Sequence, residues 1–405
     1  MISTLKSAYR RIHIFLYHHF FLKRMINKVR NKNRIKVVFA LNDLPVWKTE
    51  RLYLEMKKNP QIEPILGISK SLQTEGNETV LVQYCKAKDY SFVMLDIGKT
   101  IVSQLAPDVI VYQKPYGGIY PKKHSFYANT KSLFIYVGYA YRGVIAKWNT
   151  NLPLHKYCWQ NYYENEMIAE VSRPLMSYPE SIIVTGTPFM DELMTPKECF
   201  VNPWRSSASQ KRIIYAPHHT IGDMHAEGIA YSTFLENGEF MLAMAKKFKS
   251  KVHFAFKPHP LLINNLYKIW GKDKTDNYYA EWQSMENAQF ENGVYVGLFK
   301  HSDAMIHDCA SFMVEYLYTG NPVMFLMRED NGDDIRSKFT QECLNLHYVA
   351  WSHSDIENFI LDVIDGKDPM KKKRASFYEE CLCPPHGKSA CQNIINAILG
   401  KEEYQ

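Results

Sequence analysis

Several features that define common protein classes are missing from this sequence of 405 residues. Its longest apolar stretch falls short of the about 20 residues that a membrane-spanning helix needs. Its eight cysteines form no pair of CxxC motifs, and Cys381 and Cys383 stand one residue too close together for a zinc knuckle. It also has no repeat of about 20–50 residues and no low-complexity tract. We therefore expect neither a solenoid nor a zinc ribbon, and we expect reduced thiols in the cytoplasm.

Acidic and basic residues are nearly balanced over most of the chain, although the formal net charge is +7. Residues 1–33 hold eight Lys or Arg and no Asp or Glu, which leaves 41 basic and 42 acidic residues in the rest. The basicity therefore belongs to one end of the sequence, and we expect no nucleic-acid partner. Hydrophobic residues make up 46% of the chain, which supports packed cores and argues against disorder.

Residues 1–33 combine this positive charge with an apolar centre. The apolar residues are Ile12, Ile14, Phe15, Leu16, Tyr17, Phe20, Phe21 and Leu22. The segment also lacks the small-residue cleavage site of a signal peptide. We expect an amphipathic helix at an anionic membrane surface, where each nearby basic residue contributes about 1 kcal/mol. The alternative is a first helix packed on the body with its charges solvated.

Apolar runs alternate with helical segments through the rest of the chain, which indicates parallel sheets covered on both faces. In the first half, strands are expected at 34–41, 62–68, 91–95, 108–112, 132–137 and 181–185. In the second half, they are expected at 212–216, 252–256 and 347–351, and on both sides of a helix that Gly320 stops. The polar stretch 196–210 separates the two series. The fold class predicted is α/β, with two doubly wound halves and a cleft between them.

Polar side chains follow three strands of the second half, at the point where each strand ends. They belong to residues 217–220 (PHHT), 257–260 (KPHP) and 307–311 (HDCAS). Because the carboxyl ends of parallel strands meet at the same edge of a sheet, we expect these groups to converge. A cation and imidazoles at that edge can stabilise a departing phosphate. We therefore expect His218, Lys257 and His259 to be catalytic.

The third group opens a βαβ unit, and the free N–H groups at the start of its helix suit a phosphate. The residues expected to bind the nucleotide or its phosphates are His219, His307, Asp308, Cys309, Ala310, Ser311, Phe312 and Glu315. Asp308 would hold a backbone turn or bind a ligand hydroxyl, and Ser311 would cap the helix or a phosphate. Glu315, one turn later on the helix, suits a ribose diol.

At these residues the chain resembles the CDP-glycerol glycerophosphotransferase family, whose members assemble teichoic-acid-like polymers. The matching motifs are residues 215–217 (YAP), 257–260 (KPHP), 307–311 (HDCAS), 315–317 (EYL), 320–325 (GNPVMF) and 386–390 (HGKSA). The resemblance implies the GT-B arrangement of two Rossmann-like domains facing a cleft, with the nucleotide held by the second. The domains expected are a membrane-associating segment 1–33, an acceptor domain 34–195, a linker 196–210, a nucleotide-donor domain 211–385 and a closing helix 386–405.

The activity that the resemblance implies is transfer of glycerol phosphate, or a related polyol phosphate, from a CDP-activated donor. The acceptor would be lipid-linked or a glycan, in the synthesis of a surface polysaccharide or teichoic-acid-like polymer. Family members are peripheral membrane proteins, so we expect a place on the cytoplasmic face of a bacterial cell membrane. We expect no cofactor, and no metal either, because the sequence shows no convincing Asp-x-Asp motif.

The resemblance does not extend to the residue expected to act as the catalytic base. The family carries a His-Gly-Thr-Pro turn in its first domain, and the comparable strand end here reads YVGYAY at 136–141. The acceptor side is expected at Tyr116, Gly138, Tyr139 and His155. The candidate bases are His124, His155 and the Tyr139 hydroxyl.

The nucleotide turn also departs from the family, because His307, Cys309 and Ala310 replace a threonine, a tyrosine and a serine. Another CDP-polyol or a nucleotide sugar is therefore open as the donor. The two alternatives are a GT-B glycosyltransferase for capsule or lipopolysaccharide assembly and a non-catalytic, membrane-associated nucleotide-binding protein.

Overall fold

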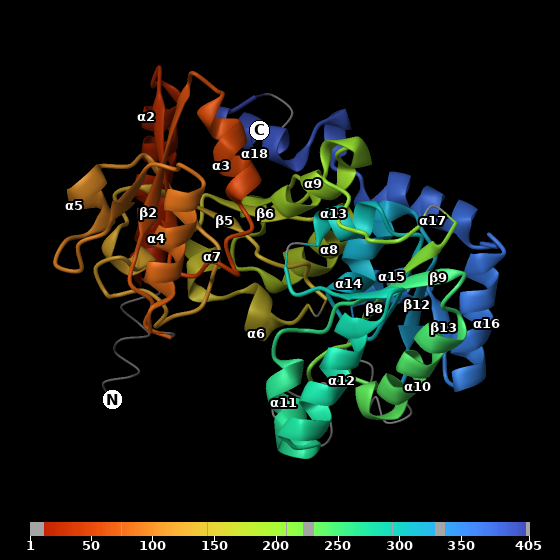
Figure 1. Ribbon diagram of the computed structural model, residues 1–405. Coiled ribbons are helices and arrows are strands. Elements are labelled where there is room, and N and C mark those ends of the chain that lie inside the picture. Colours follow the sequence, from red (N-terminus) through yellow and green to blue (C-terminus); the bar gives the residue numbers. More distant parts are fainter. Residues whose placement is uncertain are drawn as a thin grey trace, which may run out of the picture. The chain divides into compact units, whose positions relative to one another are not determined.

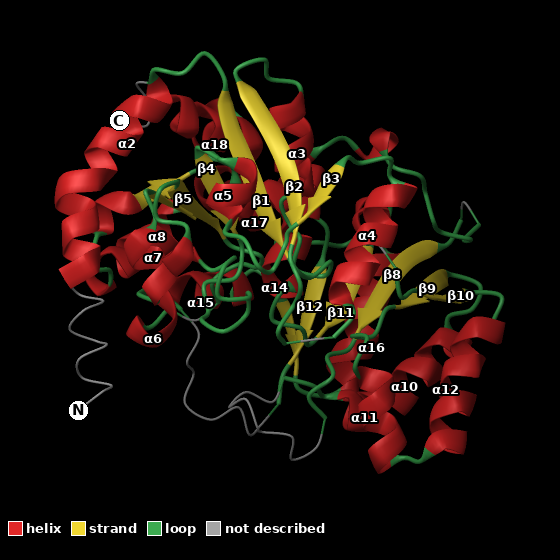
Figure 2. Cartoon of the chain, turned by 90° about the vertical axis from the view of Figure 1, so that its left-hand side faces the viewer, coloured by secondary structure: helices red, strands yellow, loops and turns green. Residues whose placement is uncertain are grey.

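The computed structural model describes residues 12–73, 75–143, 145–207, 209–221, 231–293, 295–328 and 337–401. Residues 1–11 of the basic segment and 402–405 of the closing segment lie outside the described residues. The chain divides into two α/β units, one formed by residues up to Asp191 and from Cys383 onward, the other by Glu192–Leu382 (Figure 1). In both units helices flank parallel strands (Figure 2). The predicted α/β fold with two Rossmann-like halves is confirmed.

The first unit contains a seven-stranded parallel sheet in the order β3-β2-β1-β4-β5-β6-β7. Its strands are β1 (Ile35–Leu41), β2 (Ile62–Ile68), β3 (Phe92–Met94), β4 (Val109–Tyr112), β5 (Leu133–Val137), β6 (Gln160–Tyr163) and β7 (Ile182–Val184). Successive side chains of a strand point to opposite faces, so the sheet divides two cores. Val37 and Phe39 of β1 enter one core, and Val38 and Ala40 enter the other.

Helices cover both faces of this sheet. They are α2 (Lys23–Arg30), α3 (Glu50–Lys57), α4 (Asn77–Ala87), α5 (Ile101–Leu105), α6 (Lys147–Thr150), α7 (Pro153–Tyr157), α8 (Glu166–Ser172) and α18 (Ala390–Leu399), with α9 (Asp191–Met194) at the boundary. The closing helix α18 belongs to this unit, because the Asp191 carboxylate accepts hydrogen bonds from the Ala390 and Cys391 amides at 2.8 and 2.9 Å. Carboxylates at a helix N-terminus are stabilising there.

The second unit repeats the same strand order on a six-stranded parallel sheet, β10-β9-β8-β11-β12-β13. Its strands are β8 (Lys211–Ala216), β9 (Val252–Phe256), β10 (Ala288–Phe290), β11 (Ala304–His307), β12 (Val323–Leu326) and β13 (Tyr348–Ala350). Its helices are α10 (Phe234–Lys247), α11 (Leu262–Ile269), α12 (Lys272–Ser284), α13 (Val296–Lys300), α14 (Phe312–Glu315), α15 (Lys338–Leu344), α16 (His353–Ile364) and α17 (Lys371–Phe377).

The stretch 196–210, expected as a linker, lies within the second unit. The Trp204 indole donates to the Leu298 carbonyl at 3.0 Å, and the Arg205 amide donates to the Gln289 side chain at 3.0 Å. Trp204 is buried. These contacts hold the stretch against α13 and β10, so it packs as part of the unit.

The N-terminal segment is helical over residues 12–30, including a π-helical stretch η1 (Tyr17–Leu22). Tyr17 is buried in the first unit, and His13 and His18 bond to Tyr157 and to the Lys156 carbonyl of α7. In the ranges that the structure describes, none of the helices combines the length and the apolar character needed to cross a bilayer.

Candidate active site

The strand order of the second sheet reverses between β8 and β11, which lie side by side at its centre. In open α/β sheets, ligands bind in the crevice outside the carboxyl ends of the strands at such a reversal. The chain leaves β8 into residues 217–220 and leaves β11 into residues 308–311. Two of the three polar groups expected from the sequence therefore flank the reversal itself, and the third follows the neighbouring strand β9.

The buried side chain of Asp308 connects its own turn after β11 to the turn after β8 through hydrogen bonds. It has no exposed area, and one carboxylate oxygen accepts the His218 amide at 2.5 Å. The other oxygen accepts the Thr233 amide at 2.7 Å and the Thr233 hydroxyl at 3.0 Å. Burial raises the pKa of Asp308 to about 6, although these hydrogen bonds oppose the shift. Of the two roles considered for Asp308, the geometry supports the one that holds a backbone turn.

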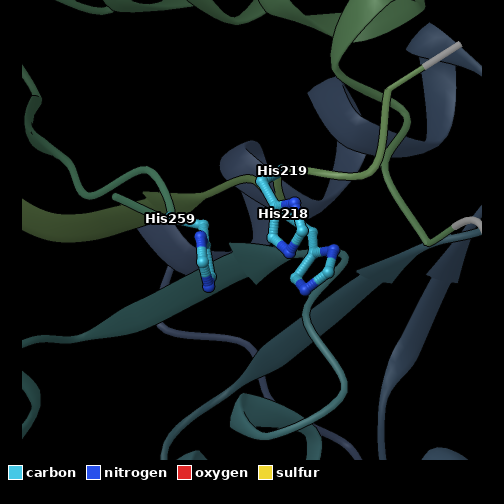
Figure 3. Close-up of side chains that lie close together, drawn as sticks. All are labelled: His218, His219 and His259. Atoms are coloured by element: carbon cyan, nitrogen blue, oxygen red, sulfur yellow. The ribbon is translucent and has the colours of Figure 1, made fainter. Parts of the chain in front are cut away.

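Three imidazoles lie close together at the ends of these strands: His218 and His219 after β8, and His259 after β9 (Figure 3). The centroid of the His259 ring lies 5.2 Å from that of His218 and 4.2 Å from that of His219. The His259 amide donates to the Pro217 carbonyl at 3.0 Å, which ties the two turns together. All three histidines are half-buried. The convergence expected from the three strand ends is therefore realised: two of them supply the imidazoles, and Asp308 of the third accepts the His218 amide.

Two of the imidazoles are held in the neutral form. Burial lowers the pKa of His218 to about 3, and His219 and His259 lower it further through their charge. Burial also lowers the pKa of His259 to about 4, with contributions from His219 and Lys257. The Nδ1 atom of His259 accepts the Leu261 amide at 3.2 Å, so its proton sits on Nε2. His259 therefore presents a neutral N–H donor.

The same three rings could hold a metal ion, because one ring nitrogen of each lies within 4.8 Å of the others. Three histidines with an open position are the ligand set of many catalytic zinc sites. A metal on Nε2 of His259 would require a proton on Nδ1, where the Leu261 N–H already points. Lys257 is a further positive charge close to His259. Both features favour a site that donates hydrogen bonds to an anion over a site that binds a metal ion.

Lys257 and Glu315 are linked through Tyr295, a residue that the sequence analysis missed. The Tyr295 hydroxyl donates to Glu315 at 2.6 Å, and the Lys257 ammonium lies 5.5 Å from the centroid of the Tyr295 ring. Lys257 also donates to the Gly293 carbonyl at 3.2 Å. Lys257 and Glu315 are only 8% and 6% exposed, so both charges are nearly buried. No motif in the sequence marks Tyr295, because its partner comes 20 residues later.

The turn that starts α14 divides the other predicted ligand residues into buried and exposed ones. The His307 ring has no exposed surface and its Nδ1 accepts the Cys309 amide at 3.1 Å, while the Cys309 thiol donates to the Ala216 carbonyl at 3.2 Å. These two side chains therefore support the turn and do not face a ligand. Ala310 is half-buried, and Ser311 is exposed and caps no amide of the helix. The Phe312 ring packs against Phe299.

In the first unit, Tyr116 and Tyr139 line one hollow of about 200 Å³, together with Tyr136 and Arg142. Gly138 adjoins it, because an added Cβ would lie 3.8 Å from the Tyr136 hydroxyl. Arg142 pairs with Glu164 and lies under the Tyr163 ring at 3.9 Å. The sequence analysis missed Arg142, since nothing local predicts its partner.

None of the three candidate bases has the properties of one. His124 is fully buried, with Nδ1 bonded to Ser69 at 2.7 Å and Nε2 bonded to the Asp96 carbonyl at 2.9 Å. His155 is 3% exposed, and burial lowers its pKa to about 3. Burial raises the pKa of Tyr139, which opposes loss of its proton. Both histidines are therefore structural, and His155 packs behind the hollow against Tyr136.

A model of the CDP-glycerol:poly(glycerophosphate) glycerophosphotransferase family matches residues 156–400, which is more than half of the chain. The chain belongs to this family. It is a CDP-glycerol glycerophosphotransferase, as the motifs of the second half predicted. None of the curated proteins compared with the glycerophosphotransferase matches its sequence.

Solved structures agree with this family in fold. The wall teichoic acid polymerase TagF, in a variant soaked with CDPG, is 16% identical, with all of both chains covered and a TM-score of 0.60. The UDP-GlcNAc 2-epimerase of Neisseria meningitidis is 15% identical, with 91% of this chain and 100% of the epimerase covered and a TM-score of 0.59. A putative UDP-N-acetylglucosamine 2-epimerase from Listeria monocytogenes is 17% identical, with 92% of this chain and 98% of the epimerase covered and a TM-score of 0.59.

The family match has a boundary that matters for the site of the glycerophosphotransferase. It includes every donor-side residue discussed above, from His218 to Glu315. It starts at residue 156, so the hollow with Tyr116 and Tyr139 lies outside it. The second unit therefore lies wholly within the family match, whereas residues 1–155 of the first unit lie before it.

Proposed function

We propose that the second unit holds CDP-glycerol at the reversal between β8 and β11 and that the enzyme transfers glycerol phosphate to an acceptor hydroxyl. The observation that carries the proposal is the group of imidazoles beside the nearly buried Lys257. Neutral N–H donors and one cation form a site for a diphosphate, whose oxygens accept hydrogen bonds. The exposed turn around Ser311 adds backbone amides at the same edge.

In the proposed reaction, the acceptor oxygen attacks the phosphorus that carries glycerol. A new P–O bond forms, the bond to the CMP oxygen breaks, and its electron pair leaves with CMP. The Nε2–H group of His259 and the ammonium of Lys257 stabilise the charge that develops on CMP. The proton of the acceptor hydroxyl passes to solvent water, so a phosphodiester, CMP and one proton are the products. Glu315, oriented by the Tyr295 hydroxyl, accepts the ribose hydroxyls.

Donor identity can be tested by thermal unfolding with CDP-glycerol, CDP-ribitol, CMP, UDP and UDP-N-acetylglucosamine. A ligand that binds only the folded state stabilises it by RT ln(1 + [L]/Kd), about 2.7 kcal/mol at one hundred times Kd. We expect CDP-glycerol and CMP to raise the melting temperature and UDP to leave it unchanged. Transfer should release CMP and should survive EDTA.

Stabilisation by UDP or UDP-N-acetylglucosamine alone would instead support a glycosyltransferase that uses a nucleotide sugar. Stabilisation by CDP-glycerol with no CMP release on any acceptor would support a non-catalytic nucleotide-binding protein. Loss of transfer in EDTA, with recovery on adding zinc, would assign the three histidines to a metal.

We also propose that the N-terminal helix brings the enzyme to the cytoplasmic face of a bacterial cell membrane, where a lipid-linked or glycan acceptor is available. One side of this helix docks on α7 through His13 and Tyr17. On the helix five apolar side chains remain 41–65% exposed: Ile12, Phe15, Leu16, Phe20 and Phe21. Exposed Lys23, Arg24 and Lys28 follow them. An apolar face next to cations fits an anionic membrane interface.

Changing Phe20 and Phe21 to glutamate should lower binding to vesicles that contain anionic phosphatidylglycerol at least about 10-fold, because burying each Phe is worth roughly 1.5–3 kcal/mol. Co-sedimentation with the vesicles measures the effect. Ile97→Glu is the matched control, since Ile97 is 62% exposed in the same unit but outside this helix. Equal binding of the double variant and the wild type would contradict the proposal.

A further inference from the structure

The hollow in the first unit lies at the carboxyl ends of β4 and β5, the edge at which open α/β sheets bind ligands. Its volume of about 200 Å³ equals roughly six or seven water molecules at about 30 Å³ each. This volume suits one small group, such as a single sugar ring, and is too small for a chain of several units. The hollow is therefore of a size to take one unit of a ligand.

The described lining of the hollow has no unpaired charge. Among the described residues that line it, Arg142 alone is charged. The Arg142 guanidinium pairs with Glu164, which is itself 4% exposed and also accepts the Arg142 amide at 3.2 Å. The neighbouring cation Lys114 is paired as well, with Asp43 at 2.7 Å. Among the lining residues that the structure describes, a phosphate would therefore meet only a guanidinium that already has a carboxylate partner, and burying an unpaired charge is costly.

The walls of the hollow are aromatic and carry hydroxyl groups. Tyr116, Tyr136, Tyr139 and Tyr141 all line it, and Tyr116 is 43% exposed. Trp148, which precedes the lining residue Asn149, is 71% exposed. Exposed aromatic faces offer apolar contact, and hydroxyl and amide groups offer hydrogen bonds. A sugar ring has both an apolar face of C–H groups and a rim of hydroxyls.

We propose that this tyrosine-lined hollow binds a neutral sugar ring, which is the terminal residue of the acceptor. Its role as the acceptor site rests on the proposed glycerophosphotransferase reaction, whereas sugar binding itself does not. A sugar is selected over a glycerol phosphate terminus because the described lining of the hollow has aromatic faces and its one cation, Arg142, is paired with Glu164. The hydroxyl that becomes the phosphodiester oxygen is therefore a sugar hydroxyl, and this enzyme adds glycerol phosphate to a glycan.

Saturation-transfer NMR can test the proposal with octyl β-glucoside and octyl N-acetyl-β-glucosaminide, both below their micellar concentrations, and with a glycerol phosphate trimer. We expect saturation of the C–H protons of the glycosides and none of the trimer. Tyr116→Ser and Tyr139→Ser should weaken the glycoside signal at least about five-fold. Tyr127→Ser is the matched control, because Tyr127 is 36% exposed in the same unit and does not line the hollow.

In transfer assays, the Tyr116 and Tyr139 variants should raise the acceptor KM at least about five-fold and leave the donor KM unchanged. Signal from the trimer alone, from no probe, or undiminished in both variants would overturn the proposal. Failure of CDP-glycerol to bind would contradict the proposed function and would leave the glycoside signal intact, so the two failures can be told apart. Wild-type-like unfolding of each variant shows that the loss is local.

Discussion

Replacing His259 by alanine should lower kcat/KM for transfer from CDP-glycerol about 100- to 1,000-fold, the usual cost of removing one donor that stabilises developing charge. The Nε2–H group of His259 is the donor in question, because Nδ1 is occupied by the Leu261 amide. Thermal unfolding should change little, since the ring is half-buried and removing it disrupts no core. Steady-state assays of CMP release measure the effect.

The nature of the contribution from His259 can be separated with His259→Gln, which keeps an N–H donor near Nε2 but cannot carry a proton between groups. We expect this variant to retain activity within about 10-fold of the wild type if hydrogen bonding dominates. His301→Ala is the control, because His301 lies before β11 and bonds to the Phe200 carbonyl at 3.2 Å. Unchanged turnover in His259→Ala would remove His259 from the mechanism.

Asp308→Asn should destabilise the enzyme by about 2–4 kcal/mol at pH 7 and abolish donor binding. The buried carboxylate accepts three hydrogen bonds, and an amide in its place points an N–H donor at groups that are themselves donors, at about 1–3 kcal/mol for each group left unsatisfied. The His218 turn loses its anchor at the same time, so the imidazoles lose their arrangement. Urea unfolding and calorimetric titration with CDP-glycerol measure the two effects.

Asp303→Asn provides a matched comparison, because Asp303 precedes β11 and accepts the Arg212 amide of β8 at 2.8 Å. It should lower stability and leave donor affinity unchanged, since it lies at the amino end of the strand. Equal loss of donor affinity in both variants would show that Asp308 acts only through stability.

The comparison of wild type and Asp308→Asn should also depend on pH. The folded-state pKa of Asp308, about 6, lies above the ordinary value of 3.8, so its titration contributes stability that is fully present below pH 3.8. This contribution is lost as the pH rises through 6, and the advantage of the wild type shrinks accordingly. The depressed pKa values of His218 and His259 act oppositely, because their contribution to stability is present above pH 6.5 and is lost as the pH falls toward their folded-state values.

Strongly apolar strands could be predicted from the sequence almost to the residue. The run at 62–68 coincides with β2, and that at 252–256 coincides with β9. Two strands were missed, β6 and β10, because their residues QNYY and AQF are polar or short. Both strands pair with a neighbour in the sheet, and Asn161 and Gln289 are buried with side-chain hydrogen bonds. A polar strand is stable where distant residues form hydrogen bonds with its side chains, and the hydrophobic pattern of the sequence does not reveal those residues.

The two α/β units, the family and the three groups of polar residues at strand ends could all be predicted without a structure. Those features follow from local patterns of apolar residues and from short motifs. Which residues of a motif are buried and which are exposed could be learned only from the folded chain: His307, Asp308 and Cys309 are buried, whereas Ser311 is exposed. The reason is that the partners of Asp308 come from positions 90 and 75 residues away, at His218 and Thr233. Contacts over such separations exist only once the strands are paired.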